Sequence, residues 1–158
     1  MGIIDAPSLV VWKMTSDLES YPSFMPFTAE CRVLKREKNS VYIYQRISPG
    51  IVTDRDYTLR VVEKSWPSSG AMAYSTQWTS ANDVGPDKRK GVLRIQNCEG
   101  SWLLEPETSA KTRATYTVFT DTGGSLPAWI ANLASSIGIR KIFTAVRRQV
   151  KDPKYWGD

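Results

Sequence analysis

The sequence predicts a single α+β domain in which a run of antiparallel strands lies between a short N-terminal helix and a long C-terminal helix. Two patterns carry this prediction. Apolar residues recur at helical spacing near both ends of the chain, whereas the middle alternates apolar and polar residues in short runs separated by turn residues. A chain of 158 residues with 41% hydrophobic and 23% charged residues can bury one ordinary core. We therefore expect one domain over residues 1–158.

The first helix is expected from residue 6 to about residue 18. Asp5 stands where an N-cap is needed, and Pro7 is tolerated in a first helical turn. Apolar residues then recur every three or four positions. Residues 19–27 contain two prolines among aromatic residues, which favours a short helical turn and a bend.

Six strands are expected in the middle of the chain, from residue 29 onward. They are placed at residues 31–36, 41–47, 57–64, 71–79, 92–104 and 112–120. Gly100 is expected to form a bulge in the fifth of them. In residues 71–79 small and large side chains alternate, so the inward face is either the small set (Ala71, Ala73, Ser75) or the large set (Met72, Tyr74, Trp78).

The last element is a long helix from Leu126 to about Val150. Ser125 is expected to cap it, directly after the turn residues 121–124. Its apolar stripe of Ile, Leu, Phe and Val residues predicts that one face packs on the strands.

The composition excludes several kinds of chemistry. The chain has no histidine, which removes Ser-His-Asp and Cys-His catalysis and the commonest metal ligand, so we expect neither a metal nor a cofactor. Cys31 and Cys98 lie far apart and are expected to be free thiols, with one disulfide as the alternative. The net charge of +5 comes from scattered basic residues, so a nucleic-acid partner ranks last.

No stretch approaches the roughly 20 apolar residues that a membrane-spanning helix needs. The first residues do not have the pattern of a signal peptide. We therefore expect a soluble protein, located in the cytoplasm or, if a leader has been removed, in the periplasm.

Several segments, in this order, resemble those of the START (StAR-related lipid-transfer) domains, within the Bet v 1-like or SRPBCC helix-grip superfamily that also includes aromatase/cyclases. The segments are Asp5-Ala6-Pro7 with Trp12, the turn YPSFMP at residues 21–26, Ser48-Pro49 leading to Arg55-Asp56-Tyr57, GSWLLEP at residues 100–106, and residues 123–132. The resemblance implies a helix-grip fold, in which a curved antiparallel β-sheet wraps around the long C-terminal helix and leaves an internal apolar cavity.

One feature departs from the family pattern. Family members have at least one strand before the first helix, whereas only Met1–Ile4 precede Asp5 here. The first strand is therefore expected to be short or missing. Its loss would leave a sheet edge unpaired, so the alternatives expected are a chain that is a fragment and an edge that pairs with a second copy of the chain.

The resemblance implies non-catalytic binding and transfer of a lipid or sterol-like molecule. The gate is expected between the loop 48–56 and the start of the C-terminal helix, where exposed apolar residues would touch a membrane transiently. The gate residues are expected to be Ile51, Val52, Trp129 and Ile130. The alternative is a polyketide cyclase/dehydratase-like enzyme on the same fold, with Tyr116, Asp56 or Glu99 as its acid or base.

The resemblance favours the small set of residues 71–79 as the face that lines the cavity. The ligand-binding residues are expected on the inner faces of the strands and the last helix: Gln45, Leu59, Ser75, Gln77, Asn97, Tyr116 and Leu133. Tyr116 and Asn97 would hydrogen-bond a polar head group. The alternatives are a core tyrosine with a local partner and a turn asparagine. Arg60 is expected to point outward, and Arg55 and Asp56 to form an ion pair or anchor a loop.

Overall fold

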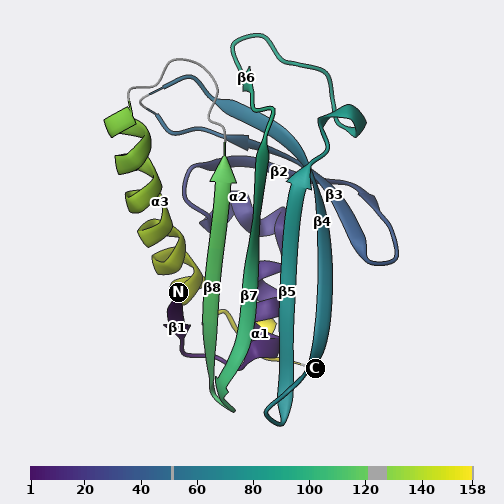
Figure 1. Cartoon of the computed structure of the whole chain (residues 1–158), viewed down its shortest axis with the longest axis vertical. Helices are drawn as coiled ribbons and strands as arrows, with labels where there is room; N and C mark the ends of the chain where they lie inside the picture. The colour runs from purple at the N-terminus through teal and green to yellow at the C-terminus, as the bar shows by residue number, and fades with distance from the viewer. Residues whose placement is uncertain (51, 121–127, 158) are drawn as a thin grey trace.

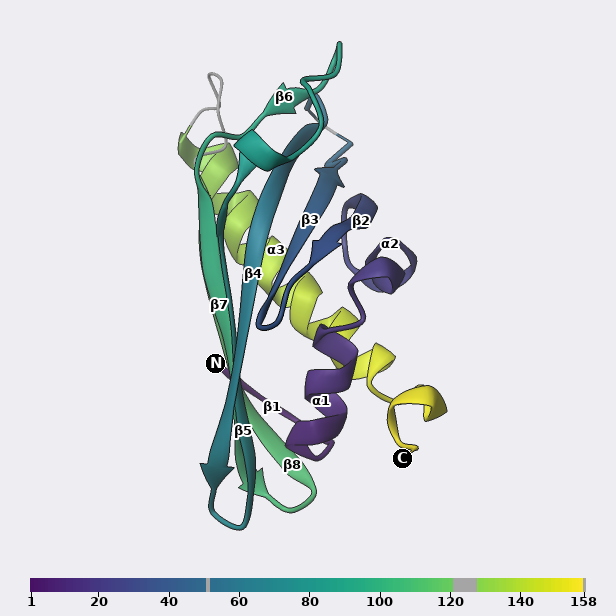
Figure 2. The same ribbon diagram turned by 90° about the vertical axis from the view of Figure 1, so that its right-hand side faces the viewer.

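The computed structural model has an α+β architecture with a curved, unclosed sheet on one side and the helices on the other. It describes residues 1–50, 52–120 and 128–157, and within residues 128–136 it describes the backbone only. The long helix α3 (Ala128–Gln149) lies against the concave side of the sheet. Seen from the side, α1 and α2 lie on this same face (Figure 2). The helix-grip fold expected from the sequence is confirmed (Figure 1).

The eight strands of the described chain form one sheet in the order β1-β8-β7-β5-β4-β3-β2, and β6 pairs in parallel with β4. All neighbours along the main path are antiparallel, and β2–β3, β4–β5 and β7–β8 are hairpins of consecutive strands joined by short turns. The strands are β1 (Gly2–Ile4), β2 (Thr28–Arg36), β3 (Ser40–Ile47), β4 (Arg55–Ser68), β5 (Ala71–Ser80), β6 (Leu93–Arg94), β7 (Cys98–Thr108) and β8 (Lys111–Thr120).

The expectation of a short first strand is confirmed. β1 has three residues and pairs with β8 only from Thr112 to Ala114. The part of β8 beyond Ala114 therefore has β7 as its one strand neighbour among the described residues.

The helical segments agree with the sequence in kind but not in every boundary. They are α1 (Ser8–Thr15), η1 (Leu18–Ser20), α2 (Tyr21–Phe24), η2 (Asn82–Val84), α3 (Ala128–Gln149) and η3 (Pro153–Tyr155). The expected N-cap at Asp5 is wrong. Pro7, with an extended ψ of 151°, takes the N-cap position of α1, and Asp5 instead lies 3.7 Å from the ammonium of Lys111. The expected cap at Ser125 lies outside the described residues.

The single strand expected at residues 92–104 is wrong, because two separate strands occupy this stretch. Leu93–Arg94 pair with Arg55–Asp56 at the start of β4, and the Arg94 guanidinium binds the Asp56 carboxylate at 2.7 Å. This interaction draws β6 away from the line of β7, and Asn97 lies in the exposed link between the two.

Gly100 is not a bulge, because it pairs in regular register with Trp78 and Val118. A Cβ atom there would lie 2.6 Å from Cζ2 of Trp78 and would also meet the carbonyl oxygen of Thr117. The glycine is therefore needed because the Trp78 ring lies directly on its backbone.

The core lies between the concave face of the sheet and the helices. Val11 and Met14 of α1, Leu104 of β7 and Val146 of α3 are completely buried in it. Cys31 and Cys98 are buried free thiols, as expected from their spacing. No helix in the described part of the chain is long and apolar enough to cross a membrane.

Candidate functional site

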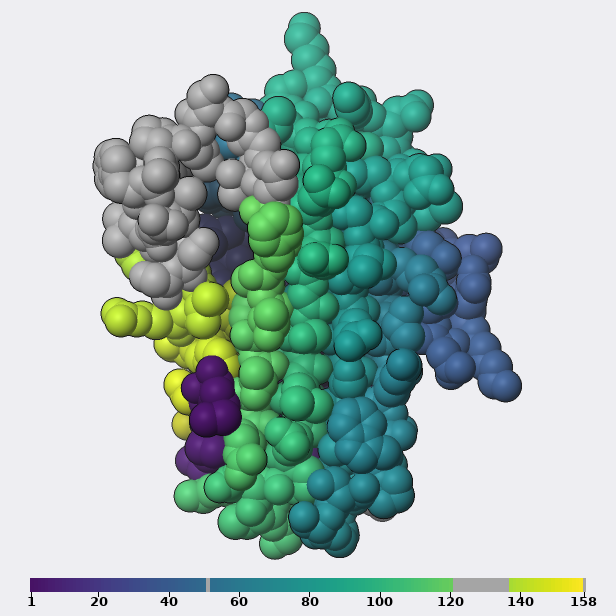
Figure 3. Space-filling model, in the orientation of Figure 1, coloured from purple at the N-terminus to yellow at the C-terminus, as the bar shows by residue number. Residues whose placement is uncertain are grey.

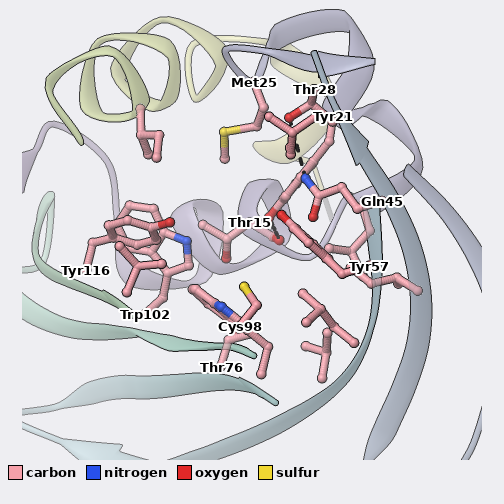
Figure 4. Close-up of a pocket in the computed structure, with 18 of the residues that line it drawn as sticks. Thr15, Tyr21, Met25, Thr28, Gln45, Tyr57, Thr76, Cys98, Trp102 and Tyr116 are labelled. Carbon is pink, nitrogen blue, oxygen red and sulfur yellow. Dashed lines mark hydrogen bonds between the residues drawn. The ribbon is translucent and has the colours of Figure 1, made fainter. Parts of the chain in front are cut away.

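A cavity of about 210 Å³ lies inside the fold, between the concave face of the sheet and the helices (Figure 4). Its wall comes from α1, η1, α2, six strands and α3. The residues that line it are Thr15, Leu18, Tyr21, Met25, Pro26, Thr28, Ile43, Gln45, Ile47, Tyr57, Leu59, Val61, Thr76, Trp78, Cys98, Trp102, Tyr116, Val118, Thr120 and Ile142. On the outside, β8, β7 and β5 form a continuous wall without an opening between them (Figure 3).

Aromatic rings make up one side of the cavity. The ring centroid of Tyr116 lies 4.7 Å from that of Trp102 and 5.8 Å from that of Trp78. Tyr57 and Gln45 lie on the opposite side (Figure 4). The rings of Trp78, Trp102 and Tyr116 come from the neighbouring strands β5, β7 and β8, so the pleat of the sheet places them on one face.

The polar groups of the cavity are only partly satisfied by the protein. The Gln45 amide nitrogen lies 3.5 Å from Oγ1 of Thr28, which is a weak hydrogen bond. The described residues provide no partner for the hydroxyls of Tyr57 and Tyr116. Thr76 is 5% exposed, and its Oγ1 is buried without a partner in the same part of the chain. Because unpaired buried polar groups cost free energy, these atoms are ready to bind a polar group from outside.

The titratable groups that face the cavity are uncharged near neutral pH. Burial raises the pKa of Tyr57, with smaller contributions from Cys98 and Tyr116, and burial also raises the pKa of Tyr116 itself. Burial raises the pKa of Tyr21, whose hydroxyl donates a hydrogen bond to the backbone carbonyl of Thr15, and of the Cys98 thiol. The tyrosines therefore act as hydrogen-bond donors rather than as bases.

The described lining contains no Asp, Glu, Lys, Arg or His. The segment 121–136, whose side chains lie outside the description, has Asp121 as its one ionisable residue in the sequence. The described part of the cavity wall is thus apolar with a few neutral hydrogen-bonding groups, which is the usual composition of a small-molecule pocket.

Three of the residues expected to bind ligand line the cavity, namely Gln45, Leu59 and Tyr116. Three others do not. Asn97 and Gln77 are exposed, and Ser75 is half-buried outside the cavity. On β5 it is Thr76 and Trp78 that face inward, so the large set rather than the small set lines the cavity.

The structure does not describe the side chains of most of the expected gate residues. Ile51 is not described, and the side chains of Trp129, Ile130 and Leu133 lie in the part of α3 described by its backbone alone. Val52 is half-buried and does not line the cavity.

The charged residues around Asp56 lie elsewhere, at the outer side of β3 and β4. Asp56 is completely buried, accepting a hydrogen bond of 2.6 Å from the hydroxyl of Tyr44 and one of 2.7 Å from Arg94. Asp56 thus forms an ion pair, but with Arg94, which the sequence did not suggest. The Arg55 guanidinium instead donates a hydrogen bond to the backbone carbonyl of Thr53 in the preceding loop. Glu99 and Arg60 are exposed, the latter as expected.

Sequence reasoning missed the helical contributions, above all Thr15, Tyr21 and Met25. Tyr21 is the first residue of the proline-containing turn at residues 21–26, and such a turn has no periodicity that tells which side chain points inward. Trp102 had a usable signal. It lies two positions before Leu104 on β7 and therefore on the same face of the strand, and Leu104 is completely buried.

The chain matches a family model described as polyketide cyclase/dehydrase and lipid transport over residues 4–147. An uncharacterized protein of Pseudomonas aeruginosa is 28% identical over 130 residues, which make up 82% of this chain and 62% of that protein. The chain therefore spans less than two thirds of the length of this relative.

Solved structures with the same fold include lipid-transfer proteins and a cyclase. A STAR-related lipid transfer protein of Xanthomonas axonopodis is 26% identical, with a TM-score of 0.81 over 95% of this chain and 82% of that chain. Human STARD10 is 20% identical, with a TM-score of 0.82 over 96% of this chain and 61% of that chain. The Zhui aromatase/cyclase of Streptomyces is 13% identical, with a TM-score of 0.58 over 94% of this chain and 87% of that chain. The last two similarities concern the fold alone.

Because the family model covers most of the chain and the topology is that of the START structures, this protein belongs to the polyketide cyclase/dehydrase and lipid-transport family and has the START-type helix-grip fold.

Proposed function

We propose that this protein binds a hydrophobic small molecule, a lipid or a sterol-like compound, in the internal cavity and carries it without chemical change. The observation that carries this proposal is an apolar cavity whose described wall holds only neutral polar groups. Affinity would come from burying apolar ligand surface, at about 25 cal/mol per Å² before the cost of ordering the ligand. At roughly 15 to 30 Å³ per water molecule, the cavity has room for about ten waters, or for a hydrocarbon group of the same volume.

The cyclase-like alternative is supported by the family and by one solved neighbour. The placement of its candidate acid–base residues argues against it. Asp56 is held by Arg94 and Tyr44 away from the cavity, and Glu99 is exposed. Tyr116 does line the cavity, but its raised pKa makes it a poor base at neutral pH.

Ligand would enter at the end of the cavity formed by Ile47, Val118 and Thr120. These residues lie at the ends of β3 and β8, where the chain continues into the loop 48–54 and the segment that leads to α3. We infer that the loop and the start of α3 open together as the gate and contact a membrane surface transiently. Liposome co-sedimentation with and without anionic lipid tests this contact.

A second copy of the chain would pair at a sheet edge through β8, since β1 covers only its first residues. The opposite edge, β2, carries the exposed cations Arg32, Lys35 and Arg36, which disfavour pairing with an identical edge. Light scattering after size exclusion measures the mass directly, and a monomer at every concentration would contradict this pairing.

The binding proposal is tested by native mass spectrometry of the purified protein, followed by solvent extraction and identification of any released compound. The matched variants are Val118→Trp, which fills the cavity at its end, and Thr117→Trp, which adds the same bulk on the exposed outer face of the same strand. We expect the first variant to lose co-purifying ligand and vesicle-to-vesicle lipid transfer, and the second to keep both. Equal transfer by the two variants would show that the cavity does not hold the ligand.

The cyclase-like alternative is tested by measuring whether the protein converts a bound substrate into a product. Release of a chemically altered product from a polyketide-like substrate, abolished by Tyr116→Phe, would establish an enzyme. Recovery of unchanged ligand would support a carrier.

A further inference from the structure

We propose that the cavity takes an uncharged lipid with an oxygen function, an alcohol or a ketone, whose oxygen accepts a hydrogen bond from the phenol of Tyr57, of Tyr116, or of both. This inference rests on the proposed function and specifies its ligand class. It separates neutral lipids from fatty acids and from lipids with charged head groups.

The described cavity wall offers no charge that could balance a charged ligand. A carboxylate, phosphate or ammonium group inside this cavity would give up its hydration and meet no opposite charge on the described wall. The arginines and carboxylates near Asp56 do not compensate, because they pair with one another outside the cavity. A buried charge without a partner is strongly disfavoured, so a charged head group is selected against.

The described cavity lining has hydroxyl groups without hydrogen-bond partners. The described residues leave the hydroxyls of Tyr57 and Tyr116 without protein partners, and they leave Oγ1 of Thr76 buried and unpaired. Tyr57 and Tyr116 approach the cavity from opposite walls, so a ligand between them can reach either (Figure 4). A neutral oxygen on the ligand would satisfy a phenol, whereas a pure hydrocarbon would leave both unpaired.

The described groups that face the cavity keep the same charge over the neutral pH range. Among the described residues, the titratable groups that face the cavity are Tyr21 of α2, Tyr57 of β4, Tyr116 of β8 and Cys98 of β7. All four have a raised pKa because they are buried, so none of them changes charge between pH 6 and pH 8. Any pH dependence of binding in this range must therefore come from the ligand.

The experiment compares four ten-carbon probes: 1-decanol, decan-2-one, decanoic acid and decane. Trp78 and Trp102 line the cavity, so their fluorescence reports occupancy, and calorimetry gives an independent affinity. At pH 8 the alcohol and the ketone are expected to bind at least about 100-fold more tightly than decanoate, as the cost of burying an unpaired charge dictates. From pH 8 to pH 6 the affinity for decanoic acid should rise about tenfold per unit, because only its neutral form binds. Decanol affinity should not change.

The variants Tyr57→Phe and Tyr116→Phe identify the donor. In at least one of them decanol should bind about threefold to tenfold more weakly, the usual worth of one hydrogen bond. Decane binding should be unaffected. The control Tyr42→Phe removes a phenol that is packed against Lys35 outside the cavity, and should change nothing.

The outcomes separate the two proposals. Decanoate binding as tightly as decanol at pH 8, without a pH slope, overturns the ligand class but leaves the carrier function standing. Full decanol affinity in both phenylalanine variants also overturns it. If none of the four probes binds, the cavity is not a lipid site and both proposals fail.

Discussion

Asp56 is a carboxylate with no solvent exposure, and it is bound by the Arg94 guanidinium and the Tyr44 hydroxyl. The side chain of Arg94 is itself 7% exposed. Removing one member of such a pair leaves an uncompensated charge, which costs more than the pair contributes. The pair also fixes β6 on β4, and thereby sets the path of the chain between β5 and β7.

We therefore expect Arg94→Met to destabilise the protein by about 3–5 kcal/mol, because Asp56 loses its cation. Arg60→Met is the control, since Arg60 lies on β4, the strand of Asp56, but is exposed, and it should change stability by less than about 0.5 kcal/mol. Urea unfolding followed by tryptophan fluorescence measures both. Equal unfolding midpoints would contradict this account of Asp56.

A second residue-scale prediction contrasts two glycines. Gly100→Ala would place a methyl group against the Trp78 ring and the Thr117 carbonyl, and should cost about 1–3 kcal/mol. Gly138→Ala should instead stabilise by about 0.5–1 kcal/mol, because Gly138 lies inside α3 with open space around it. Thermal melts of the two variants check the opposite signs, and a shift in the same direction for both would be inconsistent with these packing contacts.

At the scale of elements, an ionic network joins β2, β3, the loop before β4 and the loop before β6. Glu30 accepts hydrogen bonds of 2.8 Å from both Arg46 and Arg89. Arg46 also binds Asp54, and Arg89 reaches the hydroxyl of Tyr44 at 3.2 Å. The network thus connects the loop that we propose as a gate to the strands on either side of it.

The acid sensitivity of this network can be predicted. Hydrogen bonds from Arg89 and Arg46 lower the pKa of Glu30 below its usual 4.5. A group whose pKa is lower in the folded state stabilises the protein above its unfolded pKa, and this contribution is lost as the pH falls below about 4.5. Glu30→Gln should therefore cost about 1 kcal/mol at neutral pH, and the difference from wild type should shrink below pH 4.5.

Urea midpoints between pH 3 and pH 7 test this prediction. Glu99→Gln is the matched control, because Glu99 is exposed and has no ion pair with the described residues. If the difference between wild type and Glu30→Gln stayed constant over this pH range, the ionic network would not be the source of acid sensitivity.

At the scale of the whole molecule, the cavity is a region where the core is not filled by protein. Interiors normally pack to the density of organic crystals, so an internal space of this size weakens the fold unless a ligand occupies it. Binding and stability are therefore linked.

Saturation with ligand at 100 times its dissociation constant should stabilise the protein by about 2.7 kcal/mol, or roughly 5–10 °C in melting temperature. The shift should disappear in Val118→Trp and remain in Thr117→Trp, which differ in the face of β8 that carries the added ring. Differential scanning fluorimetry with 1-decanol provides the measurement. A shift of equal size in both variants would place the ligand outside the cavity.

The sequence by itself determined the class of fold and the order of most helices and strands. These follow from periodicity and turn residues, which act over a few neighbouring positions. The short first strand and the inward direction of Tyr116 were implied by the resemblance to the START family. The motifs spread along the chain from Asp5 to residue 132 indicated the family, and the absence of histidine narrowed the range of possible catalytic chemistry.

Only the tertiary structure decided which face of β5 lines the cavity, where the strand expected at residues 92–104 breaks, and that Asn97 is exposed. Alternation defines two faces but does not say which one meets the helices. That choice depends on packing against residues distant in sequence, such as Thr15 and Tyr21. The break before β7 likewise depends on Asp56, whose need for a buried partner draws Arg94 to β4 across 38 positions of the chain.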